Sequence, residues 1–139
     1  IKKSDDNFVI KLKDLVTSIS EQSLNHQNQS NSFLSLLKSK FKLESLSKKM
    51  LSWDLLDFNE FLTELEKSRK KSAKENEIDF AKLSLSEESE WMEYFNSQKE
   101  VVKNLRTVIN KTDLEIDQLV YELYGLSENE IDIIENANA

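Results

Sequence analysis

Cysteine and proline are missing from this chain of 139 residues, and glycine occurs once, at Gly125. Without cysteine there is no disulfide framework and no thiolate metal site, so nothing in the sequence points to an oxidising compartment. Turns and sheet corners usually need glycine or proline, and their near absence predicts a few long helices. The first expectation is therefore an all-α fold.

Long apolar runs are missing as well. No stretch approaches the ~20 apolar residues that a membrane span requires, so we expect no membrane partner. The first residues, Ile1 to Asp5, contain neither an initiating methionine nor the charged-then-apolar pattern of a signal peptide. We therefore expect a fragment of a longer protein and a cytoplasmic location.

The strongest pattern that is present is a heptad repeat that begins at Trp91. Apolar residues recur at alternating spacings of four and three, which is typical of a helix that packs along another helix. Only Gln98 and Thr112 place polar side chains on this seam. Its members are Trp91, Phe95, Gln98, Val102, Leu105, Ile109, Thr112, Ile116, Leu119 and Leu123.

Both ends of this helix carry sequence signals. Ser84 and Glu87 have the spacing of a capping box, in which each side chain satisfies a free backbone amide of the other residue. Gly125 stands where a helix end adopts left-handed backbone, and Ser127 with Glu130 repeats the capping box. We predict a helix of about residues 85–124, ~60 Å long at 1.5 Å per residue, and a short C-terminal helix of about residues 128–136.

A second seam of similar length predicts a helix of about residues 5–42, with its start near Ser4 or Asp5. The polar side chains from Ser23 to Ser32 can compete for the backbone hydrogen bonds of the helix. The alternative to one continuous helix is therefore a break in this stretch, with Ser32 as the cap of a second helix. A long amphipathic helix cannot bury its seam alone. We expect the two helices to pair within one chain, and a homodimer through the heptad seam is the alternative. The members of this second seam are Leu12, Val16, Ile19, Ser23, His26, Ser30, Phe33 and Leu37.

The middle of the chain predicts two short helices of about residues 43–54 and 58–68, the second capped by Asp57. A polar connector of residues 67–83, with the string KSRKKSAKENE at its start, is expected to follow. The predicted fold is a long antiparallel helical hairpin, similar to a coiled coil, with a small helical knob at the connecting end. We treat the chain as a single helical module.

The charge is unevenly distributed along the chain. The net charge of −7 disfavours a general nucleic-acid binder, but residues 38–82 carry eleven basic and nine acidic residues. Residues 112–139 contain eight acids and no base. A DNA-backbone contact is therefore expected only in the middle of the chain, and the alternative is a solvated loop that its lysines keep soluble. The candidate residues for such a contact are Lys67, Arg69, Lys70, Lys71 and Lys74.

Few residues in the sequence are candidates for catalysis or for metal binding. His26, the only histidine, falls on a seam and is expected to be a packed residue. Asp113 and Asp117 have a spacing that suits a divalent cation, but such pairs arise by chance in an acidic chain, so a solvated acidic face is the favoured interpretation. We expect no catalytic residue, no cofactor-binding residue and no metal ligand in this chain. Tyr121 and Tyr124 are candidates for an interdomain contact, unless the final helix covers them.

Three segments resemble one family. Residues 112–135, TDLEIDQLVYELYGLSENEIDIIE, resemble the C-terminal segment of many type II restriction–modification proteins, which include adenine-specific DNA methyltransferases. Two upstream segments also resemble sequences that precede that ending in the same family. They are LESLSKKMLSWDLLDFNEFLTELEK, residues 43–67, and LSLSEESEWMEYF, residues 83–95.

The resemblance implies a parent enzyme that uses S-adenosylmethionine to methylate adenine in DNA, with magnesium if it also cleaves DNA. This chain lacks proline, and therefore the Asn-Pro-Pro-aromatic motif of such methyltransferases. The chain is therefore expected to be a non-catalytic C-terminal spacer that braces the target-recognition region. Its expected partners are the rest of the parent protein and, through that protein, DNA. The alternative is a coiled-coil interaction or oligomerisation module unrelated to DNA. A small stand-alone enzyme has only Asp113 and Asp117 in its favour.

Overall fold

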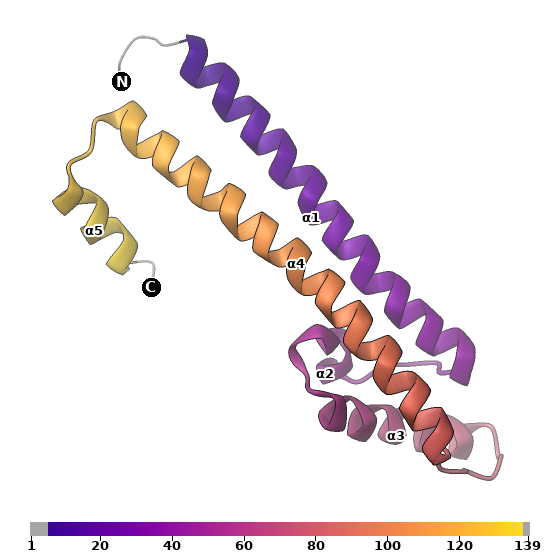
Figure 1. Cartoon of the computed structure of the whole chain (residues 1–139). Helices are drawn as coiled ribbons and strands as arrows, with labels where there is room; N and C mark the ends of the chain where they lie inside the picture. The colour runs from indigo at the N-terminus through magenta and orange to yellow at the C-terminus, as the bar shows by residue number, and fades with distance from the viewer. Residues whose placement is uncertain (1–5, 138–139) are drawn as a thin grey trace. The chain divides into compact units, whose positions relative to one another are not determined.

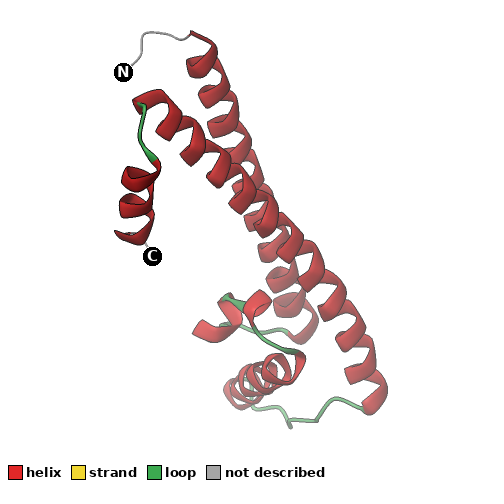
Figure 2. Ribbon diagram, turned by 60° about the vertical axis from the view of Figure 1, so that its left-hand side comes forward, coloured by secondary structure: helices red, strands yellow, loops and turns green. Residues whose placement is uncertain are grey.

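The computed structural model describes residues 6–137, and these residues form helices and loops with no strand (Figure 2). The two long helices run in opposite directions and pack against each other (Figure 1), so the predicted all-α helical hairpin is confirmed. No helix within this described range has the length and apolar character to cross a membrane. The elements are α1 (Asp6–Phe41), α2 (Lys48–Leu51), the 3-10 helix η1 (Trp53–Leu55), α3 (Phe58–Glu75), α4 (Leu85–Tyr124) and α5 (Glu128–Ala137).

The chain divides into two compact units. Unit 1 comprises Ile1–Asn25 and Arg106–Ala139, and unit 2 comprises His26–Leu105. Both long helices contribute residues to both units. The units differ in composition, because all the buried aromatic rings except that of Tyr121 belong to unit 2.

The seam of α4 has the predicted phase along its whole length. Every predicted member is buried or half-buried, and Phe95 and Val102 are fully buried. The polar member Thr112 is also buried, and its hydroxyl donates a hydrogen bond to the Val108 carbonyl at 3.1 Å. Because this bond stays within the helix, a threonine occupies the seam without an unsatisfied hydroxyl.

The seam of α1 differs from the predicted one in its first half. Val16 is 48% exposed and Ser23 is exposed, whereas Leu15 and Gln22 are half-buried. The buried face therefore includes Leu15 and Gln22 in place of Val16 and Ser23, while the predicted members Leu12 and Ile19 are half-buried as expected. The sequence left the phase open, because apolar residues stand at both 15 and 16 and polar residues at both 22 and 23.

Helix α1 continues without a break through the polar stretch of residues 23–32, as predicted. Ser30 lies half-buried in this stretch, and its carbonyl and hydroxyl oxygens both accept from the Trp53 indole nitrogen at 3.2 Å. A contact from η1 thus satisfies polar groups that would otherwise favour a break. The predicted start of the helix near Ser4 or Asp5 lies outside the described residues.

The predicted short helix of residues 43–54 is wrong in its first half. Lys42 adopts a left-handed backbone conformation with φ of 52°, which ends α1 and directs the chain into a loop. Helix α2 begins only after Ser47, whose hydroxyl accepts from the Met50 amide at 3.2 Å. Leu43 is nevertheless buried, so the loop contributes to the core that the helical pattern suggested.

The predicted helix of residues 58–68 is too short, and the predicted connector of residues 67–83 begins too early. Helix α3 extends to Glu75. The added turns lack large apolar residues, but they contain good helix formers and no proline or glycine. Ser68 and Ser72 face inward, and the Ser72 hydroxyl donates to the Lys42 carbonyl at 3.0 Å. Small polar residues therefore form the buried face of this part of α3.

Unit 2 has an aromatic core that joins all of its helices. The Phe33 ring of α1 stacks on Trp53 of η1, with ring centroids 3.9 Å apart. Phe61 of α3 meets Phe95 of α4 edge-to-face at 4.6 Å. Each such pair contributes about 0.5–1.5 kcal/mol beyond the burial of its apolar area. Leu34, Leu37, Leu43, Met50, Leu65 and Val102 complete the buried cluster.

The helix ends largely confirm the sequence signals. Reciprocal side-chain and backbone bonds form capping boxes at Ser84 with Glu87 and at Ser127 with Glu130. Gly125 has φ of 65°, and the Leu126 amide donates to the Tyr121 carbonyl at 3.0 Å, which completes a Schellman motif. A third capping box joins Asp57 to Glu60 at the start of α3.

Helix α3 ends in the same motif without a glycine. Glu77 has φ of 55°, and the following Ile78 amide donates to the Ala73 carbonyl at 2.8 Å. A residue with a Cβ atom pays roughly 1–2 kcal/mol for this conformation. Glu77 and Lys42 are therefore strained positions in a chain that keeps its only glycine for the end of α4.

Replacing Glu77 by glycine should raise the free energy of unfolding by about 0.5–1 kcal/mol, because the relief of strain exceeds the greater flexibility of glycine in the unfolded chain. Urea unfolding followed by circular dichroism measures the change. The opposite control is Gly125→Ala, which should lower stability by about 1 kcal/mol through backbone strain alone, since an added Cβ would meet no atom within 4 Å. A less stable Glu77→Gly variant would contradict the assignment of strain.

Candidate functional site

All five basic residues singled out in the sequence lie on helix α3 rather than in a connector. Four of them are exposed, and Arg69 is half-buried. A helix fixes their directions, so each one has a definite set of neighbours. From these neighbours we distinguish two kinds of basic residue: those whose contacts hold unit 2 together, and those that remain accessible to a partner. The four exposed residues are Lys67, Lys70, Lys71 and Lys74.

Arg69 has a structural role within unit 2. Its guanidinium lies over two rings, 5.0 Å from the Phe41 centroid and 5.2 Å from the Phe80 centroid. It also donates a hydrogen bond from Nη2 to the Ala81 carbonyl at 2.9 Å. Arginine suits this position because its flat cation stacks on rings while its edge keeps a donor. Arg69 thereby joins the segment after α3 to the end of α1, and part of its guanidinium is used within unit 2.

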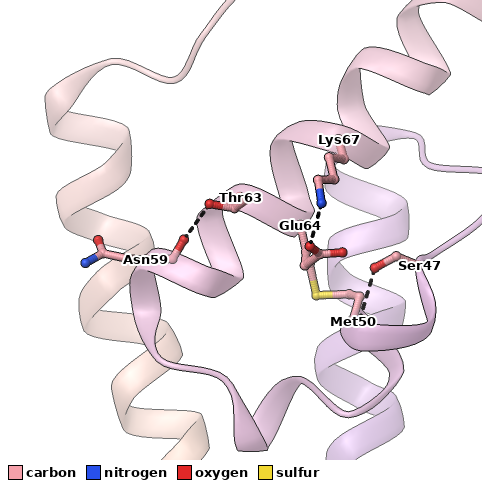
Figure 3. A network of polar contacts seen from close by, with 6 residues as sticks. All are labelled: Ser47, Met50, Asn59, Thr63, Glu64 and Lys67. Carbon is pink, nitrogen blue, oxygen red and sulfur yellow. Dashed lines mark hydrogen bonds and ion pairs between the residues drawn. The ribbon is translucent and has the colours of Figure 1, made fainter.

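Lys67 belongs to a network around a buried carboxylate (Figure 3). Glu64 is only 5% exposed, and its Oε2 lies 3.1 Å from the Lys67 ammonium nitrogen. Hydrogen bonds from the Ser47 hydroxyl and from Lys67 hold the pKa of Glu64 below its usual value, against the opposing effect of burial. Because Ser47 also caps α2, the ionised Glu64 connects α3 to the start of α2.

The remaining lysines are held less firmly. Lys70 lies 3.5 Å from the Glu66 carboxylate and 5.5 Å from the Phe80 ring centroid, both on the surface. Lys71 donates a long hydrogen bond of 3.4 Å to the Ser45 hydroxyl. Lys74, one turn further along α3, is exposed. Exposed pairs of this kind contribute little to stability, so these ammonium groups remain accessible to a partner.

A small cleft of about 170 Å³ brings part of this basic surface together. Lys67 and Lys71 line it from α3, and the loop before α2 contributes Ser45 and Ser47. Ser68 also lines it. Ammonium and hydroxyl groups are the donors with which proteins bind phosphate oxygens. The cleft therefore gathers two ammonium groups and three hydroxyl groups on one surface of unit 2.

The two candidate tyrosines of unit 1 have different surroundings. Tyr121 is 8% exposed, whereas Tyr124 is 56% exposed. Burial raises the pKa of the Tyr121 phenol, and the negative charges of Asp117 and Glu135 raise it further. The effect of Glu135, a residue of α5, indicates that the final helix lies near Tyr121. Of the two candidate tyrosines, Tyr124 is therefore the one that remains exposed.

The acidic pair and the histidine behave as residues of a packed helix surface. Burial, and secondly the charge of Asp113, raises the pKa of Asp117. Within residues 6–137 no group of three or more histidine, cysteine or acidic residues is assembled as a metal site requires. His26 is half-buried on α1, and its Nε2 atom has no hydrogen-bond partner in the described part of the chain.

Sequence reasoning missed Glu64 and Lys99. Glu64 lies on the inward face of α3 between the buried Phe61 and Ser68, so its place within the apolar spacing was a usable signal. Lys99 donates to the Leu56 carbonyl at 2.6 Å, and its ammonium lies 5.7 Å from the Phe95 ring centroid. Lys99 had no local signal, because its partner is 43 residues away in the sequence.

The chain belongs to a family described as Domain of unknown function (DUF8810), which matches residues 5–120. The match spans α1 to α3 and most of α4, so both units contain residues of the family domain. No curated protein and no solved structure matches the chain.

The Glu64 network predicts a pH dependence of stability. Since the folded-state pKa of Glu64 lies below its usual value of 4.5, the stabilisation is complete above that pH and is lost as the pH falls through the folded-state value. Glu64→Gln should therefore flatten the fall in unfolding free energy below pH 4.5, as measured by urea titrations at several pH values. The control Glu66→Gln, which removes a more exposed pair, should change that slope less. Equal slopes for wild type and Glu64→Gln would contradict an ionised Glu64.

The position of Arg69 predicts that lysine cannot replace it. Arg69→Lys should destabilise unit 2 by about 1 kcal/mol, because an ammonium loses the stacked geometry and the directed bond to Ala81. Hydrogen exchange should speed up most in residues 76–84. Lys74→Ala, with no comparable contact, should leave the exchange of this segment unchanged. Unaltered exchange in Arg69→Lys would show that another contact holds the segment.

Proposed function

We propose that the chain is a non-catalytic helical scaffold in a restriction–modification protein, where it braces the target-recognition region. The observation that carries this proposal is the pairing of two uninterrupted helices of 36 and 40 residues through a continuous seam. The resemblance of residues 112–135 to the C-terminal segment of adenine-specific DNA methyltransferases supplies the biological setting.

The polar contacts of unit 2 support a mechanical role. The Trp53 indole bonds to Ser30, Lys99 bonds to the Leu56 carbonyl, and Glu64 bonds to Lys67 and Ser47. Apart from the Glu64–Lys67 pair within α3, these contacts join one element to another, as a mechanical role requires. A protein that reads DNA must hold its recognition element in register with the grooves, and paired helices are suited to that task. S-adenosylmethionine and any magnesium would be bound by other parts of the parent protein in the cytoplasm.

A contact with the DNA backbone is part of this proposal. The cleft lined by Lys67, Lys71 and three serines supports it, and exposed Lys70 and Lys74 lie on the same helix. Arg69 no longer counts as a candidate, because it is stacked between two rings. The backbone contact therefore depends on lysines alone.

A protein-interaction module unrelated to DNA is the second candidate function. It is favoured by the large apolar side chains that unit 1 exposes, among them Leu114 at 60%, Tyr124 at 56% and Ile133 at 69%. Such residues are typical of a surface that meets another protein. The heptad seam itself is occupied within one chain, so a partner would have to bind elsewhere.

The two functions differ in what the complete gene should encode. For the restriction–modification scaffold, the reading frame upstream of Ile1 is expected to contain an Asn-Pro-Pro-aromatic motif and a target-recognition region. Sequencing the gene and its transcript tests this directly. A complete coding sequence without that motif would reject the methyltransferase setting and leave the interaction module.

The backbone contact predicts a salt-dependent affinity for DNA. Anisotropy titrations of a labelled duplex at several salt concentrations should give a log–log slope that falls by about 1 in Lys71→Glu, because one phosphate contact is lost. Lys13→Glu on α1, which makes the same change in charge away from the cleft, should leave the slope unchanged. No measurable binding, or equal slopes for the two variants, would reject the backbone contact.

A further inference from the structure

Unit 2 contains a pocket with a volume of about 250 Å³ between its parts of α1 and α4. Leu36 and Lys40 line it from α1, and Glu90, Trp91 and Tyr94 line it from α4. The Leu36 side chain is 40% exposed and Tyr94 is 37% exposed. The pocket therefore presents aliphatic and aromatic surface to solvent beside one positive and one negative side chain.

The two rings of this pocket form a corner that the core holds in place. The planes of Trp91 and Tyr94 are inclined at 83°, and their centroids are 5.9 Å apart. Trp91 packs on Phe41 at 5.4 Å, and Tyr94 lies 5.8 Å from Phe33 at an interplanar angle of 15°. Because Phe33 is buried, the exposed part of Tyr94 lies on the side away from the core. Rings that are already fixed lose little freedom when a ligand binds.

Aromatic faces attract cations, and unit 2 uses this attraction elsewhere. The Arg69 guanidinium lies over the rings of Phe41 and Phe80, and the Lys99 ammonium lies 5.7 Å from the Phe95 ring centroid. Lys40 lines the pocket but lies over neither of its rings. The corner of Trp and Tyr rings is thus available to a cation from outside the chain.

The charges of the pocket restrict the ligand further. Lys40 and Glu90 are exposed, come from different helices, and form no ion pair with another described residue. A chain of net charge −7 disfavours a simple anion, and Lys40 disfavours a simple cation at the rings. A ligand that carries both charges and is neutral as a whole avoids both penalties, because each of its charges meets an opposite one.

We propose that this pocket binds a small zwitterion. Its methylated ammonium contacts the rings of Trp91 and Tyr94 beside the Glu90 carboxylate, and its carboxylate or phosphodiester group contacts Lys40. Methyl groups suit the site because they spread the positive charge and also pack on the apolar Leu36. Such a ligand has few atoms and binds an open pocket, so the dissociation constant should be about 0.1–10 mM. The proposal does not depend on the restriction–modification setting.

Nuclear magnetic resonance of the whole chain tests the proposal, with glycine betaine as the probe at about 1–100 mM. The chain has two tryptophans, which give two indole N–H signals. The Trp91 signal should shift along a saturable curve. The Trp53 signal should stay in place, since that indole is buried and bonded to Ser30, and it therefore reports any general effect of the solute.

Two compounds separate the contributions of the two charges. The anion 3,3-dimethylbutanoate has the shape of glycine betaine, with a carbon in place of the charged nitrogen. Tetramethylammonium keeps the cation and lacks the carboxylate. Each should bind about two- to fivefold more weakly than glycine betaine, because each lacks one charged contact.

A lipid headgroup could supply the same chemistry as a free zwitterion. Glycerophosphocholine and sedimentation with phosphatidylcholine vesicles distinguish these sources. Binding of the free compound without sedimentation supports a soluble ligand. Sedimentation that an excess of glycerophosphocholine reverses supports the same pocket with the headgroup as its ligand.

Substitutions in the pocket should weaken the binding of glycine betaine. Lys40→Gln, Glu90→Gln and Tyr94→Leu should each raise the dissociation constant about two- to fivefold. The matched controls are Lys38→Gln on α1 and Glu93→Gln on α4, which change exposed residues of the same helices outside the pocket. Both controls should bind as wild type does. Circular dichroism establishes that the variants keep their helix content.

Three results would overturn the proposal. The first is a Trp91 signal that does not move, or that moves only together with the Trp53 signal. The second is equal binding of glycine betaine and 3,3-dimethylbutanoate, which would show that the rings meet no cation. The third is an equal effect of Glu90→Gln and Glu93→Gln, which would place the ligand elsewhere on α4.

Discussion

The burial of the aromatic cluster around Phe95 is the constraint on which unit 2 depends. Rings from α1, η1, α3 and α4 converge there, so no single helix can hide its apolar face without the others. Phe95 has ring neighbours on three other elements: Phe33, Trp53 and Phe61. A helix of this amphipathic kind is unstable alone in water, and tertiary packing supplies most of its stability. The short elements between the long helices therefore serve to close the core at the point where the two seams are most apolar.

Polar groups then fix how those elements meet. Each buried donor or acceptor would cost about 1–3 kcal/mol if it were left without a partner. The Trp53 indole and the Lys99 ammonium are satisfied by groups on other elements, and the Glu64 carboxylate accepts a hydrogen bond from the Ser47 hydroxyl before α2. Such bonds select one arrangement among the many that apolar contacts alone would permit. The same logic explains Arg69, which holds the loop after α3 through ring stacking and one directed bond.

Unit 1 has a different physical character. Its buried side chains are few, namely Thr112, Leu119 and Tyr121, and several large apolar residues face solvent. It also holds most of the chain's net negative charge. Burial first, and nearby carboxylates second, raise the pKa values of Asp117 and Tyr121. A thin core and an exposed apolar surface suit a region that completes its packing against another molecule. The exposed Tyr124 belongs to this unit.

The sequence by itself determined the long-range periodic features. The phase of the α4 seam, the limits of α4, the capping boxes and the left-handed Gly125 follow from spacing and local backbone chemistry. Tertiary structure decided what depends on contacts between distant residues: the phase of α1 at Leu15 and Val16, the length of α3 and the left-handed Lys42. It also decided the use of the basic residues, because sequence fixes the charge of Arg69 and Lys67 but not their neighbours. Phe41 and Phe80 turn Arg69 into a structural contact, and Glu64 pairs with Lys67, which remains exposed. Only the folded chain brings those groups together.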